Sequence, residues 1–244
     1  EKKTIVAGIA AGGNTNRSII FSPDGDQLFL AVGSSCNVCL EQDPRRATVM
    51  RFRPDGSEGL IYTTGLRYVI GMDFQPNSDV LWAANQEREW LRNDLPPETA
   101  YAIYLDANAG WPYCHAGRIT DPDLGQKDSC DAELLTPRVE LPGGSKPAGM
   151  EFYLGQQFPE SYLSDLFIAL QGSNKGGSPI GYKIIHIPYG SGETEPVVRD
   201  FAVGWSGEEG DPWGTPFDLI VGPQGDLFIS DDTAGVIYRI YYDG

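Results

Sequence analysis

Four loops of this sequence place polar or charged residues directly before an apolar run. The first is "GGNTNRSIIF", with Asn14 and Arg17; the others are "TGLRYVIGM" with Arg67, "GGSKPAGM" with Lys146 and "DPWGTPFD" with Trp213. Cationic side chains that meet at one place suit a small anionic ligand, because carboxylates and phosphates accept charge-assisted hydrogen bonds. The alternative is that these cations form structural ion pairs with neighbouring Asp and Glu side chains.

The chain has two histidines, and only one of them is a candidate imidazole base. His186 lies in the strand-like run "YKIIHIP" and is expected to pack there, whereas His115 lies in the loop "GWPYCHAG". The competing expectation for His115 is an exposed loop residue without a catalytic role. In "DPDLGQKDSCD", Asp121 and Asp123 begin like a calcium loop, but no Glu closes it, which favours a solvated loop.

Four copies of one unit would bring the polar loops together. Each copy is an apolar strand, a turn and a second strand with an aromatic anchor, and the Pro-Asp-Gly and Pro-Gln-Gly turns predict hairpins. The copies are "RSIIFSPDGDQLFLA", "IGMDFQPNSDVLWAA", "AGMEFYLGQQFPESYLSDLFIA" and "FDLIVGPQGDLFIS", with the anchors Phe29, Trp82, Phe167 and Phe228.

Third strands are expected in "ATVMRFRPDG", "GYKIIHIPYG" and "GVIYRIYYDG", and fourth strands in "GLIYTTG" and "PVVRDFAVG". Four antiparallel strands per copy predict an all-β propeller of about four blades, forming a single domain over residues 1–244. The N-terminal "KKTIVAG" has the character of a fourth strand for the last blade, so the two chain ends are expected to close the ring. An open arc is the alternative. Residues 85–133 are expected to be an insertion in the second copy.

The composition excludes some partners. Thirty-four acidic and eighteen basic residues give a formal charge of −16, which repels a nucleic-acid backbone. No apolar run approaches the roughly 20 residues that span a bilayer. Neither nucleic acid nor a membrane span is therefore expected.

Two disulfides are expected from the four cysteines, Cys36–Cys39 in "SSCNVCL" and Cys114–Cys130 around a polar loop. A zinc ribbon would need a second C-x-x-C pair, and attached haem would need His where Leu40 stands. Disulfides form in oxidising surroundings, which predicts a periplasmic or extracellular protein. Four reduced thiols are the alternative.

Several segments together resemble the C-terminal two-thirds of the glucose/sorbosone dehydrogenase family: "RSIIFSPDG", "AVGSSCNVC", "DPRRATVMRFRPDG", "TGLR", "GWPYC", "GYKI" and "LFISDDTAGVIYRI". The resemblance covers nearly all of the chain. These quinoproteins bind pyrroloquinoline quinone (PQQ) and calcium on a six-bladed propeller. The resemblance implies oxidation of an aldose or similar sugar: a histidine base takes the hydroxyl proton, hydride passes to the quinone, and calcium polarises a quinone carbonyl.

The resemblance also assigns roles to residues. Asn14 stands where the family has its histidine base, and an amide accepts no proton near neutral pH. Calcium is expected at backbone carbonyls of Gln86 and Glu87. The side chains expected to bind the quinone are Arg17, Arg67, Trp111, Lys146 and Lys175.

Two functions follow from the sequence. One is a PQQ-dependent sugar dehydrogenase whose catalysis is weakened or lost at Asn14. The other is a non-catalytic propeller that binds a carbohydrate or a protein partner through the mouth of the propeller, which Asn14, Arg17, Arg67 and Lys146 are expected to rim. Two half-rings that meet in a homodimer are a further alternative to a closed ring of four blades.

Overall fold

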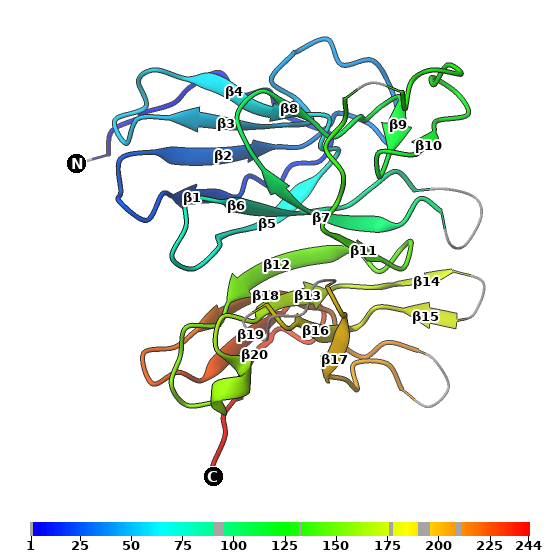
Figure 1. Cartoon of the computed structure of the whole chain (residues 1–244). Coiled ribbons are helices and arrows are strands. Elements are labelled where there is room, and N and C mark those ends of the chain that lie inside the picture. Colours follow the sequence, from blue (N-terminus) through cyan, green and yellow to red (C-terminus); the bar gives the residue numbers. More distant parts are fainter. Residues whose placement is uncertain (1, 90–94, 132, 176–177, 190–195, 208–210) are drawn as a thin grey trace.

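The structure is a computed structural model that describes residues 2–89, 95–131, 133–175, 178–189, 196–207 and 211–244. Within these ranges the chain forms twenty β-strands and one short 3-10 helix, Glu160–Tyr162, and no α-helix. Figure 1 shows that the larger sheets follow one another along the chain, from β1–β4 to β18–β20. This succession is the predicted propeller architecture of antiparallel blades.

The first two large sheets come from the N-terminal half, with a small hairpin beside them. The first sheet contains β1 (Ile19–Phe21), β2 (Leu28–Val32), β3 (Thr48–Phe52), β4 (Leu60–Thr64) and, parallel to β4, β8 (Ala107–Asn108). The second contains β5 (Val69–Phe74), β6 (Leu81–Asn85), β7 (Glu98–Ile103) and β11 (Val139–Leu141). The hairpin contains β9 (Cys114–His115) and β10 (Ile119–Thr120).

The C-terminal half forms two further large sheets and a second small hairpin. The third sheet contains β12 (Pro147–Phe152), β13 (Leu166–Leu170), β16 (Lys183–Ile187) and β17 (Arg199–Ala202). The last contains β18 (Pro216–Val221), β19 (Leu227–Asp231) and β20 (Val236–Ile240). The hairpin contains β14 (Ser173–Lys175) and β15 (Ser178–Ile180).

Each predicted copy begins with the predicted hairpin. β1 pairs with β2, β5 with β6, β12 with β13 and β18 with β19, all antiparallel. The anchors Phe29, Trp82 and Phe167 are at most 3% exposed, and Phe228 is half-buried. Apolar clusters between successive sheets therefore hold the blades together.

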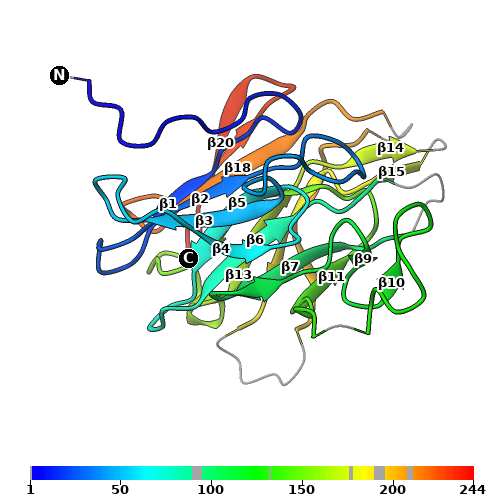
Figure 2. The same cartoon turned by 90° about the horizontal axis from the view of Figure 1, so that it is seen from above.

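The innermost strands approach one another closely because glycines lie between them. A Cβ atom on Gly71 of β5 would lie 2.2 Å from the carbonyl oxygen of Ala148 in β12, and one on Gly149 would lie 2.1 Å from the Asp218 carboxylate in β18. Figure 2 shows β18 beside the β1–β5 side of the molecule. The first strands of successive sheets thus lie beside one another, β1 with β5, β5 with β12 and β12 with β18.

The N-terminal segment does not become the fourth strand of the last sheet, which was the prediction. Residues 2–18 contain no strand, and the last sheet has three strands among the described residues. Val6 and Ile9 instead pack on the outer face of the first sheet, against a cluster that includes Leu30 and Phe52. Burial of these side chains there, together with arginine hydrogen bonds to carbonyls of the segment, outweighs strand pairing.

The predicted insertion, residues 85–133, contains β7, which pairs with β6 as the third strand of the second sheet. The excursion from the blade therefore runs from Tyr104 to Arg138, and it carries β8, β9 and β10 before β11 returns to the sheet. Its strand β8 pairs with β4 of the first sheet. The excursion consequently ties the first two blades together.

Both predicted disulfides are present, Cys36–Cys39 and Cys114–Cys130, and no free cysteine is found among the described residues. None of the helical segments in the described ranges has the length and apolarity that crossing a bilayer demands.

Candidate functional site

Arg67 is the centre of the polar cluster in front of the inner strands. Its side chain is buried, with 8% exposed. Nη1 donates to the carbonyl oxygens of Glu87 at 2.9 Å and Gln86 at 3.4 Å, and Nε donates to the carbonyl oxygen of Asn37 at 3.1 Å. Burial lowers the pKa of Arg67, and the nearby carboxylates Glu98, Glu89 and Glu87 oppose this.

Asn37 connects Arg67 to two other predicted site residues. Trp111 Nε1 donates to the same Asn37 carbonyl oxygen at 3.2 Å. The Asn37 side chain accepts from the backbone N–H of Glu89 at 2.8 Å and donates to its carbonyl oxygen at 3.0 Å. Lys146 forms an ion pair with Glu89 at 3.3 Å. The Cys36–Cys39 loop therefore carries the residue that ties these groups together.

Asn14 and Arg17 lie beside this cluster, and their side chains donate to Ser34 and to nearby carbonyl oxygens. Asn14 Nδ2 donates to Ser34 Oγ at 2.8 Å, and the Ser34 N–H donates to the carbonyl oxygen of Arg67. Arg17 donates to the carbonyl oxygens of Ala10 and Asn14 at 2.8 and 2.7 Å. Burial, and then Arg46, lower the pKa of Arg17.

Gln86 and Glu98 connect the second blade to the third. Gln86 Nε2 donates to the carbonyl oxygen of Pro147 at 3.1 Å. The buried Glu98 carboxylate accepts from the N–H groups of Glu87 and Gly144 at 2.6 and 3.1 Å. Burial raises the pKa of Glu98 to about 7, with a further contribution from Glu87.

The structure thus brings together six of the eight predicted site residues and places a seventh, Arg17, beside them. The six are Asn14, Arg67, Gln86, Glu87, Trp111 and Lys146. The predicted cation rim is largely engaged by carbonyls and by Glu89, which agrees with the alternative of structural pairing. The side chain of Lys175, the eighth, lies outside the described residues, so its role stays a prediction.

His115 is not the exposed loop residue that was expected. It is fully buried, with Nδ1 3.2 Å from Glu87 Oε2 and Nε2 3.0 Å from Asp121 Oδ2. Burial disfavours the charged imidazole, but hydrogen bonds to Glu87 and Asp121 raise the pKa of His115 overall. Because both ring nitrogens face carboxylates, His115 is poorly placed to take a proton from a substrate.

The predicted solvated loop at Asp121 and Asp123 is only half correct. Asp123 is exposed, whereas Asp121 is 1% exposed and forms an ion pair with Arg88 as well as its contact with His115. Asp121 is buried because the excursion brings it against His115 and Arg88. His186, as predicted, is packed in its strand, with Nδ1 3.0 Å from Asp165 Oδ2.

These groups can be tested against the calcium and quinone that the family resemblance implies. The two carbonyl oxygens expected to bind calcium both accept from the Arg67 guanidinium, and a divalent cation there would face that charge at contact distance. Trp111 is 5% exposed and held at Nε1, which leaves little of its ring for stacking. In this arrangement the residues do not fit either group.

A small cavity lies beside the first strands of three sheets. It encloses about 270 Å³ and is lined by Asn16, Arg17 and Ser18 before β1, Ile70 of β5, and Phe217 and Asp218 of β18. Asp218 Oδ1 accepts from the N–H of Leu219 at 2.9 Å. Burial raises the pKa of Asp218.

Sequence reasoning did not identify Asn37, Glu89 or Glu98. The available signal for Asn37 was its place inside the Cys-x-x-Cys loop, which fixes its backbone near Trp111. The contacts of Arg67 with carbonyl oxygens could not be predicted from residue types, because every residue has a backbone carbonyl.

Sequence comparisons agree with the fold. The family model "Glucose / Sorbosone dehydrogenase" matches residues 4–174, and "TrAA12-like" matches residues 107–243. An uncharacterized protein of Borreliella burgdorferi is 27% identical over 94% of this chain and 61% of its own length. The PQQ-dependent pyranose dehydrogenase of Coprinopsis cinerea is 23% identical over 98% of this chain and 41% of that protein. The chain thus spans less than two thirds of these relatives.

Solved structures are similar over nearly the whole chain. The PQQ domain of the Coprinopsis cinerea pyranose dehydrogenase in its holo form superposes with a TM-score of 0.78 at 20% identity, covering 98% of this chain and 72% of that one. The aldose sugar dehydrogenase of Escherichia coli gives 0.68 at 19% identity, covering 98% and 67%. With a family model matched over more than half of its residues, the chain belongs to the glucose/sorbosone dehydrogenase family.

Proposed function

We propose that this chain is a sugar-binding propeller of the glucose/sorbosone dehydrogenase family that does not oxidise its sugar. The observation that carries the proposal is the contact of Arg67 Nη1 with the carbonyl oxygens of Gln86 and Glu87. A resident guanidinium at these carbonyls opposes a calcium ion by charge repulsion. Without that ion the quinone loses the cation that would polarise it.

The position of the family's base supports the same function. Asn14 uses its amide nitrogen to donate to Ser34 Oγ, and an amide does not accept a proton near neutral pH. The imidazole of His115 is enclosed by Glu87 and Asp121. Neither residue therefore supplies a base for a sugar hydroxyl at the mouth.

A monosaccharide suits the cavity beside the first strands. Its volume of about 270 Å³ matches one pyranose ring with some solvent rather than a larger ligand. Asp218 accepts from sugar hydroxyls, and the side-chain amide of Asn16 donates to them, whereas Arg17 and Ser18 donate to carbonyl oxygens of the chain. The two disulfides support a periplasmic or extracellular location for this binding.

A titration of the purified chain with D-glucose, D-galactose and D-xylose, without quinone or calcium, tests the proposal. At least one aldose is expected to bind, and Asp218→Ala is expected to weaken it about tenfold by removing its acceptor. Asp243→Ala, an exposed carboxylate near the C-terminus, is the matched control and is expected to bind normally.

The same preparation is then supplied with PQQ, calcium chloride and an artificial electron acceptor. No sugar-dependent reduction of the acceptor is expected, either in the natural chain or in Asn14→His, because the calcium carbonyls stay engaged by Arg67. Calcium-dependent quinone binding with turnover would overturn the proposal in favour of a PQQ-dependent dehydrogenase. Failure of all three aldoses to bind would overturn it in favour of a scaffold for another partner.

A further inference from the structure

Two adjoining cavities lie at the end of the second blade where β7 ends at Ile103, opposite the end at Glu98. The first encloses about 380 Å³ between the first and second sheets, and the second about 400 Å³ between the second and third. They share Val80, Ala102 and Arg138 as lining residues. We call this continuous depression the outer groove. Its functional groups are Tyr62, Tyr104, Asp79, Arg138, Gln75 and Tyr189.

Tyr104 is displayed in the outer groove on a fixed backbone. Thr63 Oγ1 donates to the Tyr104 carbonyl oxygen at 2.7 Å, and the Asp106 N–H donates to the Tyr62 carbonyl oxygen at 2.8 Å. The Tyr104 side chain is nevertheless 57% exposed. An aromatic ring on a fixed backbone and open to solvent is a stacking surface for a ligand, because only its own side-chain dihedrals have to be ordered when a ligand packs on it.

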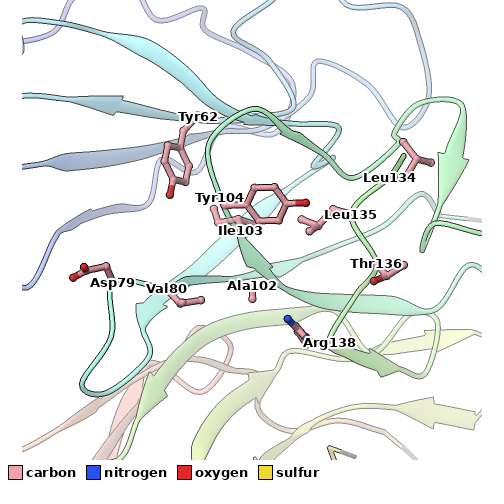
Figure 3. Close-up of a pocket in the computed structure, with 10 residues that line it drawn as sticks. All are labelled: Tyr62, Asp79, Val80, Ala102, Ile103, Tyr104, Leu134, Leu135, Thr136 and Arg138. Carbon is pink, nitrogen blue, oxygen red and sulfur yellow. The ribbon is translucent and has the colours of Figure 1, made fainter. Parts of the chain in front are cut away.

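The other groups of the outer groove surround this ring. Figure 3 shows Asp79 and Val80 on one side of Tyr104, and Leu134 and Thr136 on the other. The backbone of Arg138 is fixed by its N–H, which donates to the carbonyl oxygen of Ala100 at 2.9 Å. The groove therefore has walls from three blades and from the excursion.

The polar groups of the outer groove have unused hydrogen-bonding capacity. In the part of the chain that the structure describes, the side chains of Asp79 and Arg138 form no ion pair or hydrogen bond. Gln75 Oε1 accepts from Trp82 Nε1 and Tyr189 Oη at 3.3 and 3.0 Å, so its amide nitrogen is left to donate outward. One carboxylate, one guanidinium and one amide provide acceptors and donors without a net charge.

We propose that the outer groove binds a neutral oligosaccharide. A pyranose ring has one face rich in C–H groups, which packs on an aromatic ring such as Tyr104, and a rim of hydroxyls that both donate and accept. Asp79 accepts from such hydroxyls, while Arg138 and Gln75 donate to them. An anionic ligand is disfavoured because Asp79 balances Arg138 and the whole chain carries −16.

Two cavities that meet at Arg138 suit more than one sugar unit. Each has a volume in the range of small-ligand sites, so a chain of sugars can cross from one to the other. The outer groove is separate from the mouth. β7 runs from Glu98 at the mouth to Ile103 at the groove, which at ~3.3 Å per residue is roughly 17 Å. The two sites can therefore be assayed independently.

Titration calorimetry of the full chain tests the inference, with maltotetraose, cellotetraose and xylotetraose as probes. At least one is expected to bind. Tyr104→Ala is expected to weaken it about tenfold, and Arg138→Ala about fivefold, whereas Tyr104→Phe keeps the stacking surface and stays within about twofold. Tyr242→Ala, a tyrosine of similar exposure outside the groove, is the matched control.

Unfolding midpoints of the variants are measured alongside, and they are expected to match the natural chain because the exposed ring of Tyr104 contributes little burial. The inference is overturned if none of the three tetrasaccharides binds, or if Tyr104→Ala binds as tightly as Tyr242→Ala. It is also overturned if trigalacturonate or an octapeptide binds and the neutral sugars do not. Asp218→Ala, which tests the mouth, is expected to leave tetrasaccharide binding unchanged.

Discussion

The Arg67 guanidinium donates from Nη1 to the backbone carbonyl oxygen of Glu87 at 2.9 Å. Through this contact a cation of the chain lies against a carbonyl at which the family resemblance places calcium. The same guanidinium reaches Asn37, which also accepts from Trp111. The Arg67 guanidinium and the Trp111 indole are thus joined through their hydrogen bonds to Asn37 of the Cys36–Cys39 loop.

Replacing Arg67 is expected to destabilise the fold. Arg67→Met keeps most of the buried volume but leaves the carbonyl oxygens of Gln86 and Glu87 without a donor, at a cost of about 2–4 kcal/mol in the free energy of unfolding. Arg53→Met removes an exposed pair with Glu58 and is expected to cost under about 1 kcal/mol. Urea unfolding measures both, and equal losses would contradict the structural role of Arg67.

Glu151 is expected to make stability depend on pH. Burial, and then the nearby Asp73, raise the pKa of its carboxyl from the ordinary value of 4.5 to about 8. Between these values the folded state holds a proton that the unfolded state has released. Its contribution is therefore fully present below pH 4.5 and is lost as the pH rises through about 8, by up to about 1.4 kcal/mol per pH unit.

Glu151→Gln is expected to flatten this part of the pH profile, because a neutral amide cannot lose a proton. Urea unfolding of the variant and of the natural chain across the same pH range gives the difference. Glu58→Gln, an exposed carboxylate, is the control and should leave the slope as it is. A parallel pair of profiles for Glu151→Gln and the natural chain would refute the assignment.

His115 is expected to stabilise the excursion most strongly in its charged form. His115→Gln leaves Glu87 and Asp121 without their shared cation, at a cost of about 3 kcal/mol at low pH. Because the pKa of His115 is raised in the fold, this stabilisation is present below its ordinary value of 6.5 and is lost as the pH rises through the folded value. The gap between variant and natural chain should narrow accordingly.

His186→Gln is the matched comparison, since His186 contacts one carboxylate, Asp165, rather than two. It is expected to cost less than His115→Gln in thermal unfolding at the same pH. The reverse order would mean that the Glu87–His115–Asp121 contact does not hold the excursion.

The two disulfides are expected to contribute unequally. Cys114–Cys130 closes a loop of separation 16 and should stabilise by about 3 kcal/mol, whereas Cys36–Cys39, with separation 3, should stabilise by about 2 kcal/mol. Paired Cys→Ala variants measure this by urea unfolding. Only the loss of Cys36–Cys39 is expected to alter Trp111 fluorescence, because Asn37 holds that indole.

The sequence predicted the parts of the fold that depend on local chemistry. Pro-Asp-Gly turns gave the hairpin at Ser22–Gly25, and a β-branched, aromatic pattern gave β16 and β20. It misjudged the N-terminal strand, since Val6 and Ile9 have the same residue types whether they pair in a sheet or pack on one. That choice depends on which face is left uncovered, and residue order does not encode it.

For the site, the repeat predicted that the loops of Asn14, Arg67 and Lys146 lie together, and the family resemblance added Trp111. The sequence did not reveal what these side chains contact. The partners are mostly carbonyl oxygens, as for Arg67, or residues brought in by the excursion, as for His115 with Asp121. Such contacts depend on long-range folding rather than on spacing.

The absence of side chains at Gly71 and Gly149 has a consequence for how such a protein can diversify. Backbone meets backbone and carboxylate there, so the distance between neighbouring blades is set by main-chain dimensions and has no slack for a larger residue. The spacing of the first strands is therefore fixed by the backbone. New ligand preferences can be acquired by exchanging loop residues around these strands while the spacing stays constant.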